Sequence, residues 1–410
     1  MVLDLRPFRG IRPKVDLAEK VASPPYDVVN SEEARELARG NPLSFLHVVK
    51  PEIDLDPGIN LYDDSVYAKG VANLQSLVKD HMVRDDKPCF YVYQQKMGDH
   101  VQAGVVGNVS AWDYHADLVR KHELTRADKE ADRTRHVRDL NANTGPVFLT
   151  YRSREGINTL VDEARKETPV YDFISPDGIA HTFWVVSDAE KIAALKTAFC
   201  DLDCLYVADG HHRSASGSNI AIERKEKNPG HTGDEEYNFF MAVMFPHDQL
   251  AIMDYNRVVK DLNGLSKDEF LERANLAFDL ERTDVAKPDA PHRIGMYLNG
   301  QWYALTAKEG TYDAADPVKS LDVAILQGNL LEKVLGIGDP RKDSRIDFVG
   351  GIRGMKELEK RVSQGWAVAF AMYPTSVEQL MAIADAGAIM PPKSTWFEPK
   401  LLSGLLVHVF

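Results

Sequence analysis

Cysteine is scarce in this sequence of 410 residues, where only Cys89, Cys200 and Cys204 occur. Three cysteines at irregular spacing are too few for a disulfide framework or a zinc site. Long apolar runs are also missing: none approaches about 18 residues, and the N-terminus has no apolar signal core. We therefore expect a cytoplasmic protein with no membrane partner.

The sequence also lacks an excess of basic residues. Asp and Glu outnumber Lys and Arg by 62 to 49, which gives a net charge of −13. A field of that sign repels the phosphate backbone of nucleic acids. The densest basic segment, Arg120–Arg138, is interspersed with acidic residues, as is typical of a solvated helix face. We therefore expect no DNA partner.

Low-complexity segments, internal repeats and clean linkers are absent from the sequence as well. The hydrophobic fraction of 44% and the charged fraction of 27% are ordinary for a globular protein with a large core. Strand and helix patterns intermix without a repeated βαβ spacing, which favours an α+β fold. We expect three interlocked regions, at residues 1–115, 116–265 and 266–410.

Local patterns predict individual elements. Asn30 and Glu33 have the spacing of a capping box that begins a helix, and Gly40 ends it. Turn residues between strand-forming runs predict hairpins. The predicted strands are 41–49, 147–151 and the pairs 90–95 with 102–109, 170–173 with 181–186, 239–245 with 251–255, and 293–298 with 301–307. The further predicted helices are 66–83, 156–166, 189–200, 214–227, 267–278, 321–335 and 376–386.

The most informative stretch is Cys204–Gly217, where a strand pattern runs into Asp209-Gly210 and a helix pattern follows from Ser214. The first N–H groups of a helix lack helical acceptors, and the helix dipole favours negative charge there. Gly210 lets a ligand approach the backbone closely. The stretch therefore predicts an anion-binding turn.

An Asp-Gly pair can also be an ordinary turn between a strand and a helix. The density of polar groups favours function, because Asp209, His211, His212 and Arg213 lie within five residues, directly after a strand that reads as buried. A purely structural turn does not need such a cluster.

Five motifs occur in order along the chain: Ser23–Asp27, His122-Glu123, Asn143 with Pro146–Leu149, Tyr206–Arg213 and Pro392–Phe397. Together they resemble, from end to end, a prokaryotic family known as a domain of unknown function whose members are loosely described as ParB-like. The turn resembles that of the ParB and sulfiredoxin superfamily, in which a Gly-x-x-Arg turn at a helix start binds nucleotide phosphates. The resemblance is greatest to the free serine kinases.

This resemblance implies a ParB/sulfiredoxin-like nucleotide-binding core with large α/β insertions and a C-terminal extension. Sulfiredoxin chemistry needs a thiol where this chain has His211, and DNA partitioning needs a helix-turn-helix segment that we do not find. The implied activity is a kinase, a phosphotransferase with an alcohol group as acceptor, such as free serine. ATP or ADP and Mg²⁺ are the implied cofactors, and a homodimer is left open.

The resemblance also assigns roles to residues. Glu123 is the candidate base that takes the proton from the substrate hydroxyl, although an ion pair to Arg120 or Arg126 on a helix face is the structural alternative. Asp209 and His211 join Glu123 as catalytic candidates, and Asp209 is the candidate ligand for Mg²⁺. The candidate nucleotide-binding residues are Gly210, His211, His212, Arg213, Lys129, Arg133 and Asn143.

Two further clusters are candidates for substrate binding. Tyr26 and Asp27 lie on a stiff, proline-rich segment that can bind an amino or hydroxyl group. Lys393, Ser394 and Thr395 suit a closing loop, since the glycines of a Walker motif are missing. The alternative function is a nucleotide-hydrolysing switch without a small-molecule acceptor.

Overall fold

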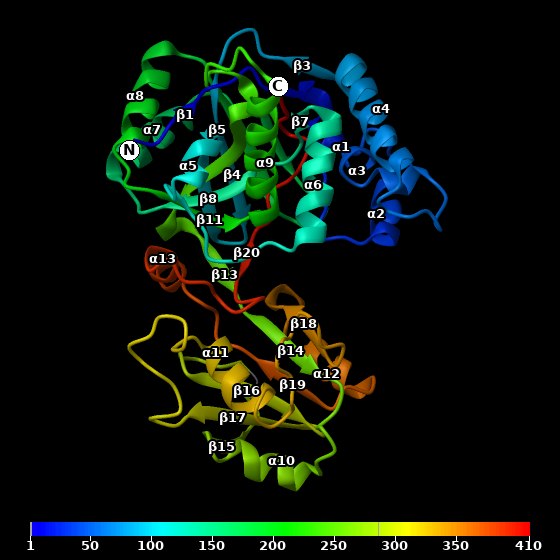
Figure 1. The fold of residues 1–410 in the computed structure, drawn as a ribbon, viewed down its shortest axis with the longest axis vertical. Coiled ribbons are helices and arrows are strands. Elements are labelled where there is room, and N and C mark those ends of the chain that lie inside the picture. The colour runs from blue at the N-terminus through cyan, green and yellow to red at the C-terminus, as the bar shows by residue number, and fades with distance from the viewer. Residues whose placement is uncertain (1, 286) are drawn as a thin grey trace. The chain divides into compact units, whose positions relative to one another are not determined.

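A computed structural model describes residues 2–285 and 287–410 of the chain (Figure 1). The described residues form two compact units. Unit 1 comprises residues up to Leu250 together with Pro399–Phe410, and unit 2 comprises Ala251–Glu398. Helices and sheets are mixed in each unit, so the chain has an α+β fold.

Unit 1 is built on a nine-stranded sheet with the order β6-β11-β8-β12-β5-β4-β10-β9, to which β1 adds by pairing with β5. The pairs β11–β6 and β12–β8 are parallel, and the other pairs are antiparallel. The strands are β1 (Leu5–Arg6), β4 (Phe90–Met97), β5 (His100–Ser110), β6 (Val119–Arg120), β8 (Val147–Tyr151), β9 (Tyr171–Ile174), β10 (Ala180–Val186), β11 (Leu205–Asp209) and β12 (Phe239–Pro246).

Helices of unit 1 pack on this sheet and on each other because each buries an apolar side. Helix α9 contacts β12 and β8, and α6 lies beside α9 (Figure 1). The helices are α1 (Ala18–Val21), α2 (Ser31–Ala38), α3 (Leu46–Val49), α4 (Asp64–His81), α5 (Ala111–His115), α6 (Ala127–Leu140), α7 (Glu155–Ala164), α8 (Ala189–Cys200) and α9 (His211–Lys227), with 3-10 turns at Val15–Leu17, Pro51–Asp54, Glu236–Asn238 and His247–Gln249.

The C-terminal residues 399–410 complete unit 1. Strand β21 (His408–Val409) pairs with β7 (Ala142–Asn143), and Val407 bridges to Ile11 in β2 (Ile11–Pro13), which also pairs with β3 (Met82–Arg84). Val407 is fully buried in a second apolar core formed with residues of α2, α3 and α4. The end of the chain is therefore part of the core.

Unit 2 has an antiparallel six-stranded sheet in the order β15-β17-β16-β19-β14-β18, and a separate pair of β13 and β20. Its strands are β13 (Ala251–Met253), β14 (Tyr255–Val259), β15 (Phe278–Thr283), β16 (Arg293–Leu298), β17 (Gln301–Ala307), β18 (Ile346–Gly350), β19 (Val368–Ala371) and β20 (Trp396–Glu398). Its helices are α10 (Lys267–Ala274), α11 (Asp322–Leu326), α12 (Met355–Ser363) and α13 (Val377–Asp385), with a π-helix at Gln327–Leu331 and a 3-10 turn at Gly351–Arg353.

Predictions that rest on local turn and capping chemistry are confirmed. The capping box of Asn30 and Glu33 begins α2, and helix α8 has the predicted bounds. The hairpins β4–β5, β9–β10 and β16–β17 form as expected. Helix α9 begins at His211, earlier than predicted, so that the polar cluster lies in its first turn.

Two predicted strand features are wrong. Residues 41–49 do not form a strand, because Leu46–Val49 is a helical turn whose apolar side chains pack into the core beside α4. Strand β12 does not pair with residues 251–255, because β5 and β8 already occupy both of its edges. The helix predicted over 321–335 is divided into α11 and the π-helix.

The predicted region boundary at residue 115 falls among elements that share one sheet, since β4 and β5 lie in the same sheet as β8, β11 and β12. The two compact units divide after Leu250 and after Glu398. The three regions stay a prediction. Among the helices described, none combines the length and apolar character needed to cross a bilayer.

Candidate functional site

The predicted turn is a strand-to-helix junction in unit 1. Strand β11 ends at Asp209, Gly210 adopts the left-handed conformation with φ +93°, and α9 begins at His211. A side chain is strained at that φ, so the turn requires glycine. The local sequence therefore aims the first turn of α9, with its unpaired N–H groups and positive dipole end, at the space beside Asp209.

Asp209 is the anchor of this turn. One carboxylate oxygen accepts the Gly210 N–H at 2.8 Å, and the other accepts from the Lys400 ammonium at 2.8 Å. Burial alone would raise the pKa of Asp209, but the Lys400 charge and hydrogen bond hold this pKa well below its usual range. Asp209 is therefore an ionised partner of Lys400.

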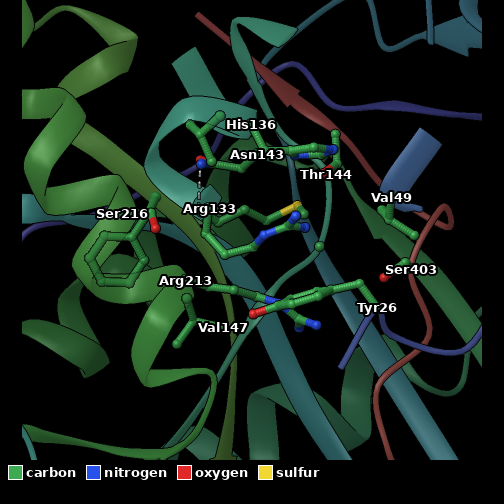
Figure 2. A pocket seen from close by; sticks show the side chains of 14 residues that line it. Tyr26, Val49, Arg133, His136, Asn143, Thr144, Val147, Arg213, Ser216 and Ser403 are labelled. Carbon is green, nitrogen blue, oxygen red and sulfur yellow. Dashed lines mark hydrogen bonds between the residues drawn. The ribbon is translucent and has the colours of Figure 1, made fainter. Parts of the chain in front are cut away.

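Arg213 lies in the first turn of α9, and the Tyr26 ring lies beside it (Figure 2). Its guanidinium donates to the Pro146 carbonyl at 2.9 Å and lies 3.5 Å from the Asp27 carboxylate. The Tyr26 ring centroid is 5.2 Å from the guanidinium carbon of Arg213 and 4.3 Å from that of Arg133. The fold thus brings together two predicted nucleotide ligands and two predicted substrate ligands.

The Tyr26 hydroxyl stays protonated in this setting. Burial raises its pKa, and Asp27 acts in the same direction against the two arginines. Arg133 is itself paired with Asp132 at 2.7 Å, so its charge is neutralised by a neighbour. The positive charges of Arg133 and Arg213 are thus balanced by the carboxylates of Asp132 and Asp27, next to the neutral Tyr26.

Glu123 lies beside the turn, in the loop between β6 and α6. One ligand atom from each of Glu123, His122 and His211 lies within 4.8 Å of the others. The rings of His122 and His211 meet edge to face at 4.5 Å between centroids. The predicted base and the predicted nucleotide turn are therefore adjacent.

The two histidines of this cluster are almost fully buried, with exposures of 1% for His122 and 7% for His211. Within residues 2–285 and 287–410, both ring nitrogens of His122 and Nε2 of His211 have no hydrogen-bond partner. Burial lowers the pKa of His211 to about 4, although Asp209 acts in the opposite direction. Burial, and then His211, lower the pKa of His122 well below its usual range. Both rings are therefore neutral at pH 7, with nitrogens available to a ligand.

The remaining predicted nucleotide ligands have other contacts. His212 accepts the Arg126 backbone N–H at 3.1 Å, and burial lowers the pKa of its ring. Lys129 is half-buried and its ammonium is 3.3 Å from the Tyr62 hydroxyl. Asn143 is buried, and its side-chain oxygen accepts the Met241 N–H at 3.3 Å and is 3.1 Å from His408. Asn143 therefore has a structural role, whatever else it binds.

A small pocket adjoins Arg213. Its volume of about 30 Å³ has room for about one water molecule. Arg133, Asn143, Arg213 and Ser403 line it together with the Tyr26 ring (Figure 2). A nucleotide is too large for this pocket, which can accept at most a small polar group.

The second predicted substrate cluster belongs to unit 2. Lys393 is exposed, with its ammonium 5.5 Å from the centroid of the Tyr255 ring. The Ser394 hydroxyl donates to the Pro391 carbonyl at 2.6 Å, and the Ser394 carbonyl accepts from Thr375. The role of Lys393, Ser394 and Thr395 in a site of unit 1 stays a prediction.

Sequence reasoning did not assign His122 and Lys400 to the site. His122 lies in one of the five motifs, and its neighbour Glu123 is the signal that points to it. Lys400 had no such signal, because its partner Asp209 is 191 positions away in the chain. Only the fold brings Lys400 and Asp209 together.

The described site places this protein in the class of α+β proteins with an anion-suited turn at a helix start. Residues 5–324 match the model of a family described as protein of unknown function (DUF1015), and the chain belongs to that family. Among curated proteins, none matches the chain.

Several solved structures are similar to parts of the chain. A free serine kinase in complex with AMP shares 12% identity over 72% of this chain and 86% of its own, with a TM-score of 0.35. SbnI with C-terminal truncation, from Staphylococcus aureus, shares 13% over 73% and 85%, with a TM-score of 0.40. A conserved hypothetical protein from Pyrococcus furiosus shares 14% over 73% and 92%, with a TM-score of 0.35.

Proposed function

We propose that this protein is a nucleotide-dependent kinase that phosphorylates the hydroxyl group of a small molecule, such as the free amino acid serine. The observation that carries the proposal is the position of Glu123, which has a carboxylate oxygen within 4.8 Å of a ring nitrogen of His211 in the turn. Phosphoryl transfer to an alcohol asks for a phosphate-binding turn and a nearby base. The position of Glu123 beside the turn supports both roles.

The nucleotide phosphates would bind at Gly210, His211, His212 and Arg213, with Lys129, Arg133 and Asn143 as further proposed ligands. ATP, when bound, supplies the phosphoryl group. Arg213 suits this role because its guanidinium already lies 3.5 Å from one exposed carboxylate, that of Asp27, and a phosphate can replace that partner. Neutral His211 can donate one hydrogen bond without adding charge.

The metal prediction for Asp209 has a weaker basis. Both oxygens of its carboxylate are engaged, by the Gly210 N–H and by Lys400, so Asp209 as it stands fits Mg²⁺ poorly. The assignment stays a prediction, and no step is derived through the ion. Lys400 provides a positive charge at the same place.

Glu123 would take the proton from the substrate hydroxyl, and Tyr26 and Asp27 would hold the substrate. The exposed Asp27 carboxylate suits an ammonium group, which is the group that distinguishes an amino acid from a simple alcohol. Lys393, Ser394 and Thr395 are retained as proposed substrate ligands of unit 2.

A second candidate function is nucleotide hydrolysis without a small-molecule acceptor, as in a switch protein. The partnerless nitrogens of His122 and His211, together with the Glu123 carboxylate, favour it, because two imidazoles and a carboxylate are a common ligand set for zinc. Such an ion would activate water. Glu123 would then be a ligand and not a base.

The test is a single-turnover assay of wild type and Glu123→Gln with ATP and serine. Loss of a positioned base lowers such a rate by about 10²–10⁴-fold, while the neutral amide leaves nucleotide affinity nearly unchanged. Glu155→Gln, an exposed glutamate in the first turn of α7, is the matched control and keeps the wild-type rate.

A Glu123→Gln rate within about threefold of wild type, far short of that contribution, would contradict the assignment of the base. Formation of ADP at the same rate without any acceptor would favour the switch. Metal analysis of the purified protein completes the comparison. Only the second candidate function requires a bound transition metal, and Glu123→Gln would then weaken the binding of that metal.

A further inference from the structure

Unit 2 contains a pocket that none of the proposed nucleotide or substrate ligands lines. It has a volume of about 300 Å³, at the lower end of the range for small-molecule sites. Its polar lining is Arg257, Gln327, Asp339 and Arg341, and Phe348 and Leu331 are among the apolar side chains. We call it the Arg257 pocket.

Arg257 lies in the middle of β14 and is only 3% exposed. Its guanidinium donates to the backbone carbonyls of Tyr255 and Lys393, the latter at 2.9 Å. Among residues 2–285 and 287–410 it forms no ion pair with a carboxylate, and burial lowers its pKa to about 10. Two of its five N–H groups are thus engaged with carbonyls, and the positive charge has no counter-charge.

An isolated buried charge is costly, and proteins rarely retain one without a partner. Carbonyl oxygens satisfy hydrogen bonds but carry no net charge. Since Arg257 lines an open pocket, the missing negative charge has a place to bind. A ligand anion is therefore the simplest partner for Arg257.

The rest of the lining fixes the kind of anion. Arg341 is paired with Asp339 at 3.0 Å, so these two charges cancel and the lining keeps the single charge of Arg257. One positive charge matches a carboxylate better than a phosphate dianion. The Phe348 ring, 5.5 Å from the Arg257 guanidinium, and Leu331 offer apolar contact for the body of the ligand.

The backbone at the pocket also departs from regular structure. Gln327 and Leu331, which line it, are the first and last residues of the π-helix Gln327–Leu331. The Gln327 amide donates to the Ile337 carbonyl at 2.7 Å and so ties the π-helix to the loop that contains Asp339 and Arg341. π-helices are rare and occur frequently at functional sites.

We propose that the Arg257 pocket of unit 2 binds a small organic acid, with its carboxylate on Arg257 and its apolar body against Phe348 and Leu331. This proposal is independent of the kinase function, because none of these residues belongs to unit 1.

The test is a ligand-observed NMR titration of the full chain with benzoate, with its neutral analogue benzamide and with phenyl phosphate. Benzoate is expected to bind at least about tenfold more tightly than benzamide, as a charged hydrogen bond predicts. Arg257→Met is expected to remove that preference. Arg353→Met, an exposed arginine of the same unit outside the pocket, is the matched control and keeps it.

Equal affinity for benzoate and benzamide, or an unchanged preference in folded Arg257→Met, would overturn the proposal. Phenyl phosphate binding more than about tenfold tighter than benzoate would overturn the assignment of a carboxylate. If Arg257→Met does not fold, the benzoate titration of Arg341→Met tests the proposal instead. It leaves Asp339 without its arginine in the pocket and should weaken benzoate at least threefold, and unchanged binding would overturn the proposal.

Discussion

Two arginines, one in each unit, differ in how their charge is neutralised. Arg213 of unit 1 has the Asp27 carboxylate at 3.5 Å and the Pro146 carbonyl at 2.9 Å. Arg257 of unit 2 is more deeply buried, and in the part of the chain that the structure describes its hydrogen bonds go to two backbone carbonyls and none to a carboxylate. A charge that already has an exposed partner can exchange it for a ligand at little cost, whereas a buried charge with none gains its first counter-ion from the ligand.

The comparison teaches that a cluster of charges and a single unpaired charge are different signals of binding. The turn of unit 1 balances two ion pairs, Arg213 with Asp27 and Lys400 with Asp209, which suits a multiply charged nucleotide that brings its own charges. The pocket of unit 2 keeps one net charge, which suits a monoanion. The expected ligands are therefore of different size and charge.

The largest expected effect that separates the two arginines is on nucleotide affinity. Arg213→Ala removes a fixed, bidentate donor worth about 1.5–3 kcal/mol, so ATP should bind roughly ten- to a hundredfold more weakly. Arg257→Met should leave ATP affinity unchanged. Isothermal titration of the three proteins measures both values, and equal ATP affinity in wild type and Arg213→Ala would break the comparison.

A second difference concerns pH. The pKa of His211 is lowered to about 4, so the unfolded chain binds more protons than the folded one between pH 4 and the ordinary histidine pKa of about 6.5. Stability therefore rises with pH in this window, by up to about 1.4 kcal/mol per pH unit from His211. His211→Gln should reduce the slope of unfolding free energy against pH, measured by urea denaturation.

Arg257→Met serves as the control for that slope, because its guanidinium does not titrate between pH 4 and 6.5. An identical slope in wild type and His211→Gln would mean that His211 is charged in the folded protein. The inference that the rings of His122 and His211 are both neutral at pH 7 would then be wrong.

The smallest expected effect is on the backbone of the turn. Gly210→Ala forces a side chain into a left-handed conformation and should cost about 1–2 kcal/mol of stability. Gly178, with φ +83° in the exposed turn between β9 and β10, provides a matched control with the same strain. Thermal unfolding should show similar losses in both variants, while only Gly210→Ala should weaken ATP binding in the titration.

The parts of the fold that local chemistry determines could be predicted. The turn at Gly210 could be found because its strand, glycine and polar cluster are contiguous, and the hairpins could be found from their turn residues. Residues 41–49 were mistaken for a strand, because burial against α4 overrides the strand preference of Val48 and Val49. The local sequence pattern does not indicate that these residues will be buried against α4.

The rest of the site depends on contacts between distant segments. Nothing near Lys400 indicates Asp209 as its partner, and nothing near Tyr26 indicates a position between Arg133 and Arg213. Arg257 reads as an ordinary strand residue, and only the missing carboxylate around it marks the pocket. The lack of a carboxylate near Arg257 can be recognised only when the residues around it in the fold are known.

The return of residues 399–410 to unit 1 has a consequence for synthesis on the ribosome. Asp209 leaves the exit tunnel long before Lys400, and all of unit 2 is translated between them. Strand β7 likewise cannot pair with β21 until residues 408–409 have been translated. Ser23 cannot form its bridge until Ser403 has been translated. Because domains generally fold as units during translation, unit 2 can fold while unit 1 is still incomplete. The charge balance of the turn is then established only after Lys400 has been released, so a nascent chain stalled before Lys400 carries the turn without its lysine.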